Sequence, residues 1–142
     1  LHLLNRYKHT GSLSNHELSE IKEKLPDTRF VMVMHIIKNT IKRTTTKDPV
    51  NEDNKKRITT HSVRIIMNIF DTKTGKKVYQ VTSFNSADET YTLHSSNFLG
   101  EVLDVMLLDK NGYPEPAPTN LIVKAMATED VSDLYRSLEK NL

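Results

Sequence analysis

The chain contains 142 residues, of which 37% are hydrophobic and 27% are charged, and its net charge is +2. This size and balance are typical of one soluble globular domain and exclude wholesale disorder, so we expect a single domain over residues 1–142. The lack of cysteine excludes disulfides, thiolate metal ligands and a cysteine nucleophile, and no apolar run approaches the ~18 residues of a membrane-spanning helix.

Two helical signals open the chain. Residues 1–9 place leucines and a tyrosine at helical spacing, which predicts a short first helix. The S-x-x-E pattern from Ser14 to Glu17 is a capping box, which predicts the start of a second helix. Apolar residues follow at helical spacing, and Pro26 ends the pattern.

Residues 30–37 change to the two-residue period of a β-strand and are apolar on both faces. This pattern predicts a central strand that is covered on both sides. One cover is a layer of helices, and the other is either the first helix or a second molecule. The exposed face of this strand is therefore our candidate surface for a homodimer.

Residues 44–57, TTTKDPVNEDNKKR, combine Pro49 and several charges with no apolar periodicity. Such a segment favours a long mobile loop. We therefore expect a hairpin with an overlong tip at about residues 43–57.

Beyond this tip, residues 63–70 alternate cleanly between the two faces of a strand. The segment from Asp71 to Gly75 predicts a tight reversal, because glycine accepts a positive φ. Residues 77–84 form the return strand, so the three strands make an antiparallel meander.

The C-terminal part reads as a loop over residues 85–96, a helix over 98–107 and an extended, proline-rich linker. From Thr119 onward the pattern predicts either one long helix or two short ones. The expected fold class is α+β: an antiparallel three- or four-stranded meander sheet in two layers, with helices packed on one face.

No pattern in the sequence predicts catalysis. Glycine-rich phosphate loops and nucleophile elbows are absent from the sequence, and no histidine pair has metal-binding spacing, so we expect no enzyme activity, no cofactor and no metal. His35 and His61 lie on neighbouring predicted strands and could face each other, but hydrogen-bonded structural histidines are favoured. The segment with Asp71, Lys73 and Gly75 fails as a calcium loop, because a lysine occupies a ligand position.

Charge is distributed unevenly along the chain. Residues 38–77 carry eleven basic and four acidic side chains, whereas residues 85–142 carry four basic and ten acidic ones. Either the two sets solvate different faces, or the basic set attracts an acidic partner. Six basic residues around the expected tip are the candidate partner-binding residues: Lys42, Arg43, Lys47, Lys55, Lys56 and Arg57.

These basic residues leave two classes of partner open. A protein partner is favoured, because a long loop in a compact domain is often functional. A nucleic-acid-binding module is the alternative, since the same side chains could straddle a phosphate backbone. Against it, the tip has no aromatic residue for base stacking, and the acidic C-terminal part would repel nucleic acid.

One stretch of the sequence has a family resemblance. A hydrophobic strand beginning Arg29-Phe30, a charged variable loop and the run VRIIMNIFDTKTGKKVY ending at Tyr79 resemble small lipoproteins of Gram-negative envelopes. The later YPEPAP segment beginning at Tyr113, followed by a C-terminal helix, is similar to their usual ending. Tyr79 stands where these families commonly have tryptophan.

The resemblance implies an α+β domain like the amino-terminal domain of TolB and those of outer-membrane accessory lipoproteins. It also implies a protein without catalytic residues that acts by contact with another envelope protein. The expected location is the periplasmic side of the outer membrane. There a lipid on a cysteine upstream of Leu1 would be the only membrane attachment.

Overall fold

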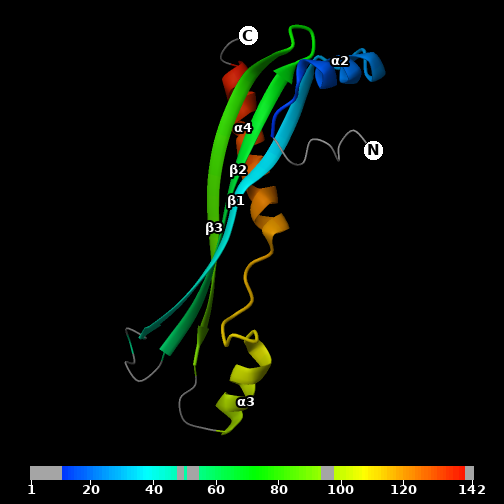
Figure 1. Ribbon diagram of the computed structural model, residues 1–142. Helices are drawn as coiled ribbons and strands as arrows, with labels where there is room; N and C mark the ends of the chain where they lie inside the picture. The colour runs from blue at the N-terminus through cyan, green and yellow to red at the C-terminus, as the bar shows by residue number, and fades with distance from the viewer. Residues whose placement is uncertain (1–10, 48–49, 51–54, 94–97, 140–142) are drawn as a thin grey trace. The chain divides into compact units, whose positions relative to one another are not determined.

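The computed structural model describes residues 11–47, 50, 55–93 and 98–139, so the helix expected over residues 1–9 lies outside the described part (Figure 1). Within that part, three strands form one antiparallel sheet in the order β1-β2-β3, accompanied by three helices. The α+β class and the meander are therefore confirmed. The elements in chain order are α2 (Asn15–Lys24), β1 (Phe30–Lys47), β2 (Lys55–Asp71), β3 (Lys76–Thr92), α3 (Phe98–Leu107) and α4 (Thr119–Glu139).

The strands are longer than their sequence patterns indicate. β1 continues to Lys47 and β2 begins at Lys55, so strands occupy both ends of the tip expected at residues 43–57. β3 likewise runs on to Thr92, through a stretch expected to be loop. Hydrogen bonding within the sheet holds these polar residues extended, although they lack the apolar alternation that marks a strand in sequence.

The prediction that residues 30–37 form the central strand is wrong. The sheet order puts β2 in the middle and β1 at an edge. In a meander of three strands the middle one in sequence is also the middle one in space, and it acquires a neighbour on each side. The helix expected over 98–107 is confirmed as α3, and the C-terminal region is one helix, α4.

The chain divides into two compact units that share the strands and α4. The first unit comprises Leu1–Lys38, Arg64–Phe84 and Met126–Leu142, and the second comprises Asn39–Val63 and Asn85–Ala125. The expectation of one domain stays a prediction.

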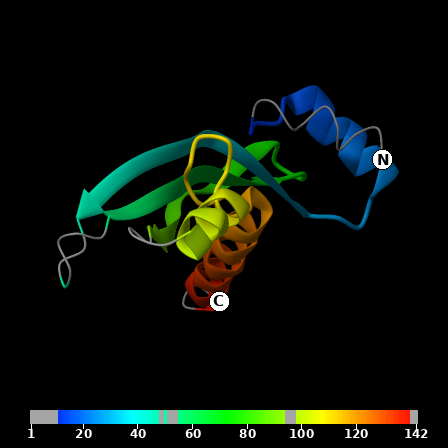
Figure 2. The ribbon, with the colours of Figure 1, turned by 90° about the horizontal axis from the view of Figure 1, so that it is seen from below.

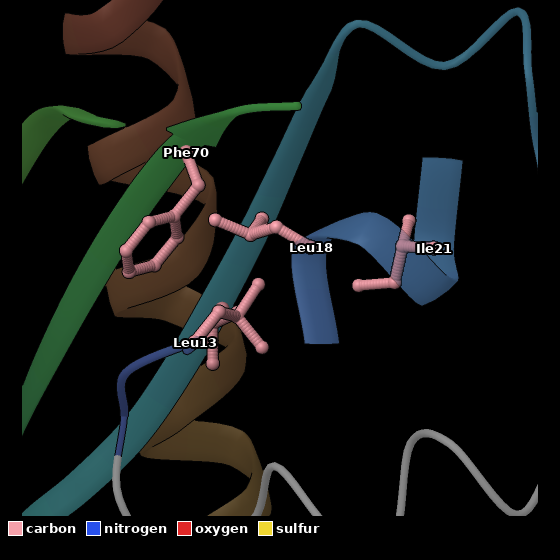
Figure 3. Packing of buried hydrophobic residues seen from close by; sticks show 5 residues of the cluster. Leu13, Leu18, Ile21 and Phe70 are labelled. Atoms are coloured by element: carbon pink, nitrogen blue, oxygen red, sulfur yellow. The ribbon is translucent and has the colours of Figure 1, made fainter. Parts of the chain in front are cut away.

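In the first unit, α2 covers one face of the sheet. Its capping box is formed as expected: the Ser14 hydroxyl accepts a hydrogen bond from the Glu17 N–H at 3.3 Å, and the Glu17 carboxylate accepts one from the Ser14 N–H at 2.8 Å. The helix packs its apolar side on β1 and β2 (Figure 3). The buried residues of this cluster are Leu13, Leu18, Ile21, Val33 and Phe70.

The opposite face of the same unit is covered by α4, as the two views of the ribbon agree (Figures 1 and 2). Ile65 and Met67 of β2 are completely buried, and Met126 of α4 is 1% exposed. Ser83 of β3 donates a hydrogen bond to Asp130 of α4. The second apolar face of the sheet is thus covered by α2 from the same chain.

The reversal between β2 and β3 forms as its residues predict. The N–H of Gly75 donates to the Asp71 carbonyl at 2.8 Å, and Gly75 has a φ of +69°. The Asp71 carboxylate accepts the N–H of Lys73 at 2.8 Å. This turn sets the register in which β3 returns along β2.

Candidate functional site

All six predicted partner-binding residues lie in the second unit, on two neighbouring strands. Three of them are on β1, and the other three open β2. Extended strand, and not loop, therefore positions these side chains. The structure brings the six together on adjacent strands but gives the arginines and the lysines different surroundings.

Both arginines bind the segment from Asp109 to Tyr113, which we call the clamp loop. Arg43 donates to the Asp109 carboxylate at 2.7 Å, where the Asp109 side chain is 7% exposed. Arg57 donates to the carbonyl of Gly112, and its guanidinium lies 5.4 Å from the centroid of the Tyr113 ring. A planar guanidinium can hydrogen-bond and stack at once, so these two residues hold the clamp loop against the strands.

Backbone hydrogen bonds close the clamp loop on Asp109. Its carboxylate accepts the N–H of Asn111 at 2.8 Å and that of Tyr113 at 3.0 Å. The Tyr113 N–H, together with Arg43 and Asn111, lowers the pKa of Asp109 to about 2 against the opposing effect of desolvation. Asp109 is therefore a charged structural anchor at neutral pH.

Gly112 adds a backbone requirement to the same loop. Its φ is +74°, in the left-handed region, and a Cβ there would collide with the Arg57 guanidinium. Only glycine allows this close approach without strain. The tyrosine that ends the loop also shares a hydrogen bond of 3.0 Å with the Thr45 hydroxyl.

The four lysines of the predicted set differ in their exposure. Lys42, Lys47 and Lys55 are exposed, and Lys56 is half-buried. Both arginines make short contacts within the chain, and a role for the six residues in binding a partner stays a prediction.

His61 has the hydrogen-bonded structural role that the sequence favoured. It is 3% exposed, and its Nε2 lies 2.6 Å from the Asn39 side-chain oxygen. Its Nδ1 bonds the carbonyl of Ala117, just before α4 begins. His35 instead lies against Gly11, where a Cβ would come within 2.9 Å of the His35 Cβ.

A small polar site lies beside α3. The pKa of Tyr91 is raised by burial, and then by its hydrogen bond to Asp104 and by the charge of that carboxylate. Asp104 also lines an open cavity of about 650 Å³. The other lining residues are Arg57, Leu93, Val105, Leu108, Asp109, Lys110 and Gly112. The clamp loop supplies three of these residues, so it forms part of the cavity wall.

In the second unit α3 exposes a stripe of apolar side chains that the sequence pattern did not identify as a binding surface. Four apolar side chains at positions i, i+3, i+4 and i+7 are exposed by 72%, 40%, 46% and 75%: Leu99, Val102, Leu103 and Met106. Val105 and Leu107 are 82% and 57% exposed. The signal in the sequence was that α3 is apolar over more of its circumference than one buried face needs.

Among the described residues, no group of three or more histidine, aspartate or glutamate side chains is arranged to hold a metal ion. No helix in that part of the chain is long and apolar enough to cross a membrane. No protein-family model, curated protein or solved structure matches this chain.

Proposed function

We propose that this chain is a non-catalytic binding domain that inserts α3 into an apolar groove on a partner protein. The observation that carries the proposal is the exposed stripe of Leu99, Val102, Leu103 and Met106. Anchors at i, i+3, i+4 and i+7 are the pattern by which a helix is recognised in a groove. Exposed apolar clusters of this kind are found at interaction surfaces more often than on the rest of a protein's surface.

The energetics are adequate for specific association. Complete burial of one large aliphatic side chain contributes about 1.5–3 kcal/mol. The net gain is smaller for two reasons. The side chains are already partly buried in the free protein, and association costs entropy. Four adjacent anchors leave enough for a reversible complex.

Charge gives the proposed partner a second property. Lys42, Lys47 and Lys55 are exposed in the same unit as α3. Positive side chains that remain solvated mainly accelerate encounter with an acidic surface and add less to final affinity. We therefore propose a partner with an acidic surface beside its apolar groove.

The location we propose is the periplasmic side of the outer membrane, with attachment through a lipid. Its support is the likeness of the β1–β3 sequence to small envelope lipoproteins. Metabolic labelling of the natural protein with radioactive palmitate, followed by membrane fractionation, tests this part separately. An unlabelled protein in the cytosolic fraction would contradict it.

A photo-cross-linking residue at Met106 tests the binding surface in cells. We expect adducts with one dominant protein, which is then purified for affinity measurement by calorimetry. Leu103→Glu should raise the dissociation constant about tenfold or more, because a charge would enter the apolar groove. Leu121→Glu is the matched control, since Leu121 is a 59% exposed leucine of α4 in the same unit.

The proposal fails if Met106 gives no adduct, or if Leu103→Glu and Leu121→Glu change the affinity equally. Nucleic-acid binding is the rival outcome, measured by fluorescence anisotropy with labelled single- and double-stranded oligonucleotides. That rival predicts binding that decreases steeply with salt and that disappears when Lys42, Lys47 and Lys55 are replaced by glutamate. Absence of binding at low salt would exclude it.

A further inference from the structure

Within the described part of the first unit, β1 has a strand on one side only. β1 is an end strand of the sheet, and among the described residues no strand lies beyond it. The N–H of Thr72 donates to the carbonyl of Arg29, which pairs the β2 end with the start of β1. In an antiparallel ladder the alternate residues then direct their backbone groups outward, and these are Phe30, Met32, Met34 and Ile36.

The side chains along this edge are also exposed. Phe30, Met32 and Ile36 are 51%, 44% and 40% exposed. They alternate with Val31 and Val33, which pack toward α2, so they point to the face that α4 covers. On α4, Val131 and Tyr135 are 43% and 65% exposed.

This edge lacks the features that keep edge strands apart. Proteins protect such strands with lysine, proline, bulges or inward-pointing charges. Residues 30–37 contain no lysine, arginine, acidic residue, glycine or proline. The other edge strand, β3, begins with Lys76 and Lys77.

We propose that β1 pairs with β1 of a second copy of this chain, antiparallel about a two-fold axis at Val33. In this register Phe30 lies opposite Ile36 of the second copy, and Met32 opposite Met34. The pairing hydrogen-bonds the outward backbone groups and joins the two three-stranded sheets into a single sheet of six strands. Because the axis is perpendicular to the sheet, both α4 helices lie on the same face and flank the apolar row.

Charge favours a second copy in this orientation. Lys38 lies just beyond the paired segment, opposite Thr28 of the second copy and next to its Asp27. A parallel pair would instead align Lys38 with Lys38 and Lys42 with Lys42, and like charges across a ladder are destabilising. A register centred on Met34 would put Lys38 opposite Phe30. The Val33-centred pair therefore joins apolar residues at Phe30, Met32, Met34 and Ile36, places His35 opposite Val31 and leaves the cation beside an acid.

The test is the oligomeric state of the full chain by sedimentation velocity over a wide range of protein concentration. The wild type should be a dimer, and Met32→Lys should raise the dimer dissociation constant about tenfold or more. Val78→Lys is the matched control, because Val78 is a 52% exposed residue of β3 in the same unit. A monomeric wild type, or equal dissociation by both variants, would overturn the proposal.

The register has its own measurement, which does not depend on that variant. The chain has no cysteine, so a spin label at Lys38→Cys reports one distance by pulsed electron resonance. Loss of one exposed charge costs little. The Val33-centred pair predicts a separation of about 34 Å, since ten residues of strand lie between the labels. A separation of about 5 Å would mean parallel pairing, and dimers without any defined distance would mean another surface; both results overturn the proposal.

Discussion

Two glycines with similar backbone angles meet very different surroundings. Gly75 has a φ of +69°, and a Cβ added there would lie 3.5 Å from its nearest neighbour, the Asn15 side-chain oxygen. Gly112 has a φ of +74°, but an added Cβ would collide with Arg57. Comparing alanine substitutions at these two positions therefore separates the free-energy cost of a left-handed backbone from that of a steric clash.

We predict that Gly112→Ala destabilises the protein more than Gly75→Ala. Gly75→Ala should cost about 1–2 kcal/mol, the penalty of the left-handed conformation. Gly112→Ala carries the same penalty and also displaces the guanidinium that bonds the Gly112 carbonyl. Urea unfolding of both variants measures the difference, and equal losses would show that Arg57 moves aside freely.

Asp109 predicts a pH dependence of stability. Its pKa is about 2 in the folded chain, below its usual value of 3.8. Between these values the unfolded chain binds more protons, so stability rises with pH, is fully present above about pH 4 and is lost toward pH 2.

Asp109→Asn should remove this increment while leaving the fold intact. We expect the variant to lose less stability than the wild type when the pH is lowered from about 5 to about 2.5, measured by urea unfolding. Asp133→Asn, at a 60% exposed aspartate of α4, serves as the control. Parallel pH profiles for Asp109→Asn and the wild type would contradict the anchoring role.

At the scale of elements, α2 illustrates a helix whose start is locally determined. The capping box involves only Ser14 and Glu17, three residues apart. The helix then buries Leu18 and Ile21 against the sheet. Local capping and tertiary burial therefore agree on the same boundaries.

Ser14→Ala should destabilise the protein by about 1 kcal/mol, the usual contribution of a serine N-cap. Ser19→Ala is a control in the same helix, because the Ser19 hydroxyl bonds the Asn15 carbonyl within the helix. Such a bond slightly disfavours the helix, so its loss should be neutral or mildly stabilising. Thermal unfolding followed by circular dichroism distinguishes the two, and equal effects would remove the capping explanation.

The strands and α3 show where local patterns are insufficient. Residues 30–37 are apolar on both faces, yet β1 is an edge strand. Alternation reports which residues share a face, and it carries no information about neighbours in the sheet. The helical stripe of α3 was predicted as helix, but its exposure depends on what the rest of the chain leaves uncovered.

At the scale of the whole molecule, β2 is the element that the other strands depend on. It is bonded to a strand on each side. Val63, Ile65 and Met67 within it are completely buried. Fluctuations that expose its amides must therefore separate most of the sheet.

Hydrogen exchange followed by mass spectrometry should give the slowest exchange in β2 and the fastest helical exchange in α3. The reason is the contrast between a central, buried strand and a helix with six exposed apolar side chains. Protection of α3 equal to that of β2 would contradict the prediction. It would mean that α3 is covered in solution.

Residues close together in the chain were enough to predict four features: the Ser14 capping box, the Asp71–Gly75 reversal, the helix of residues 98–107 and the α+β class. The central place of β2 and the exposure of α3 became visible only in the folded chain. The fold also brings Arg43 to Asp109 and Arg57 to Gly112, and these hydrogen bonds span 66 and 55 residues of chain. Short-range hydrogen bonds and periodicity are encoded in neighbouring residues, whereas burial and ion pairing depend on which distant segments the fold brings together.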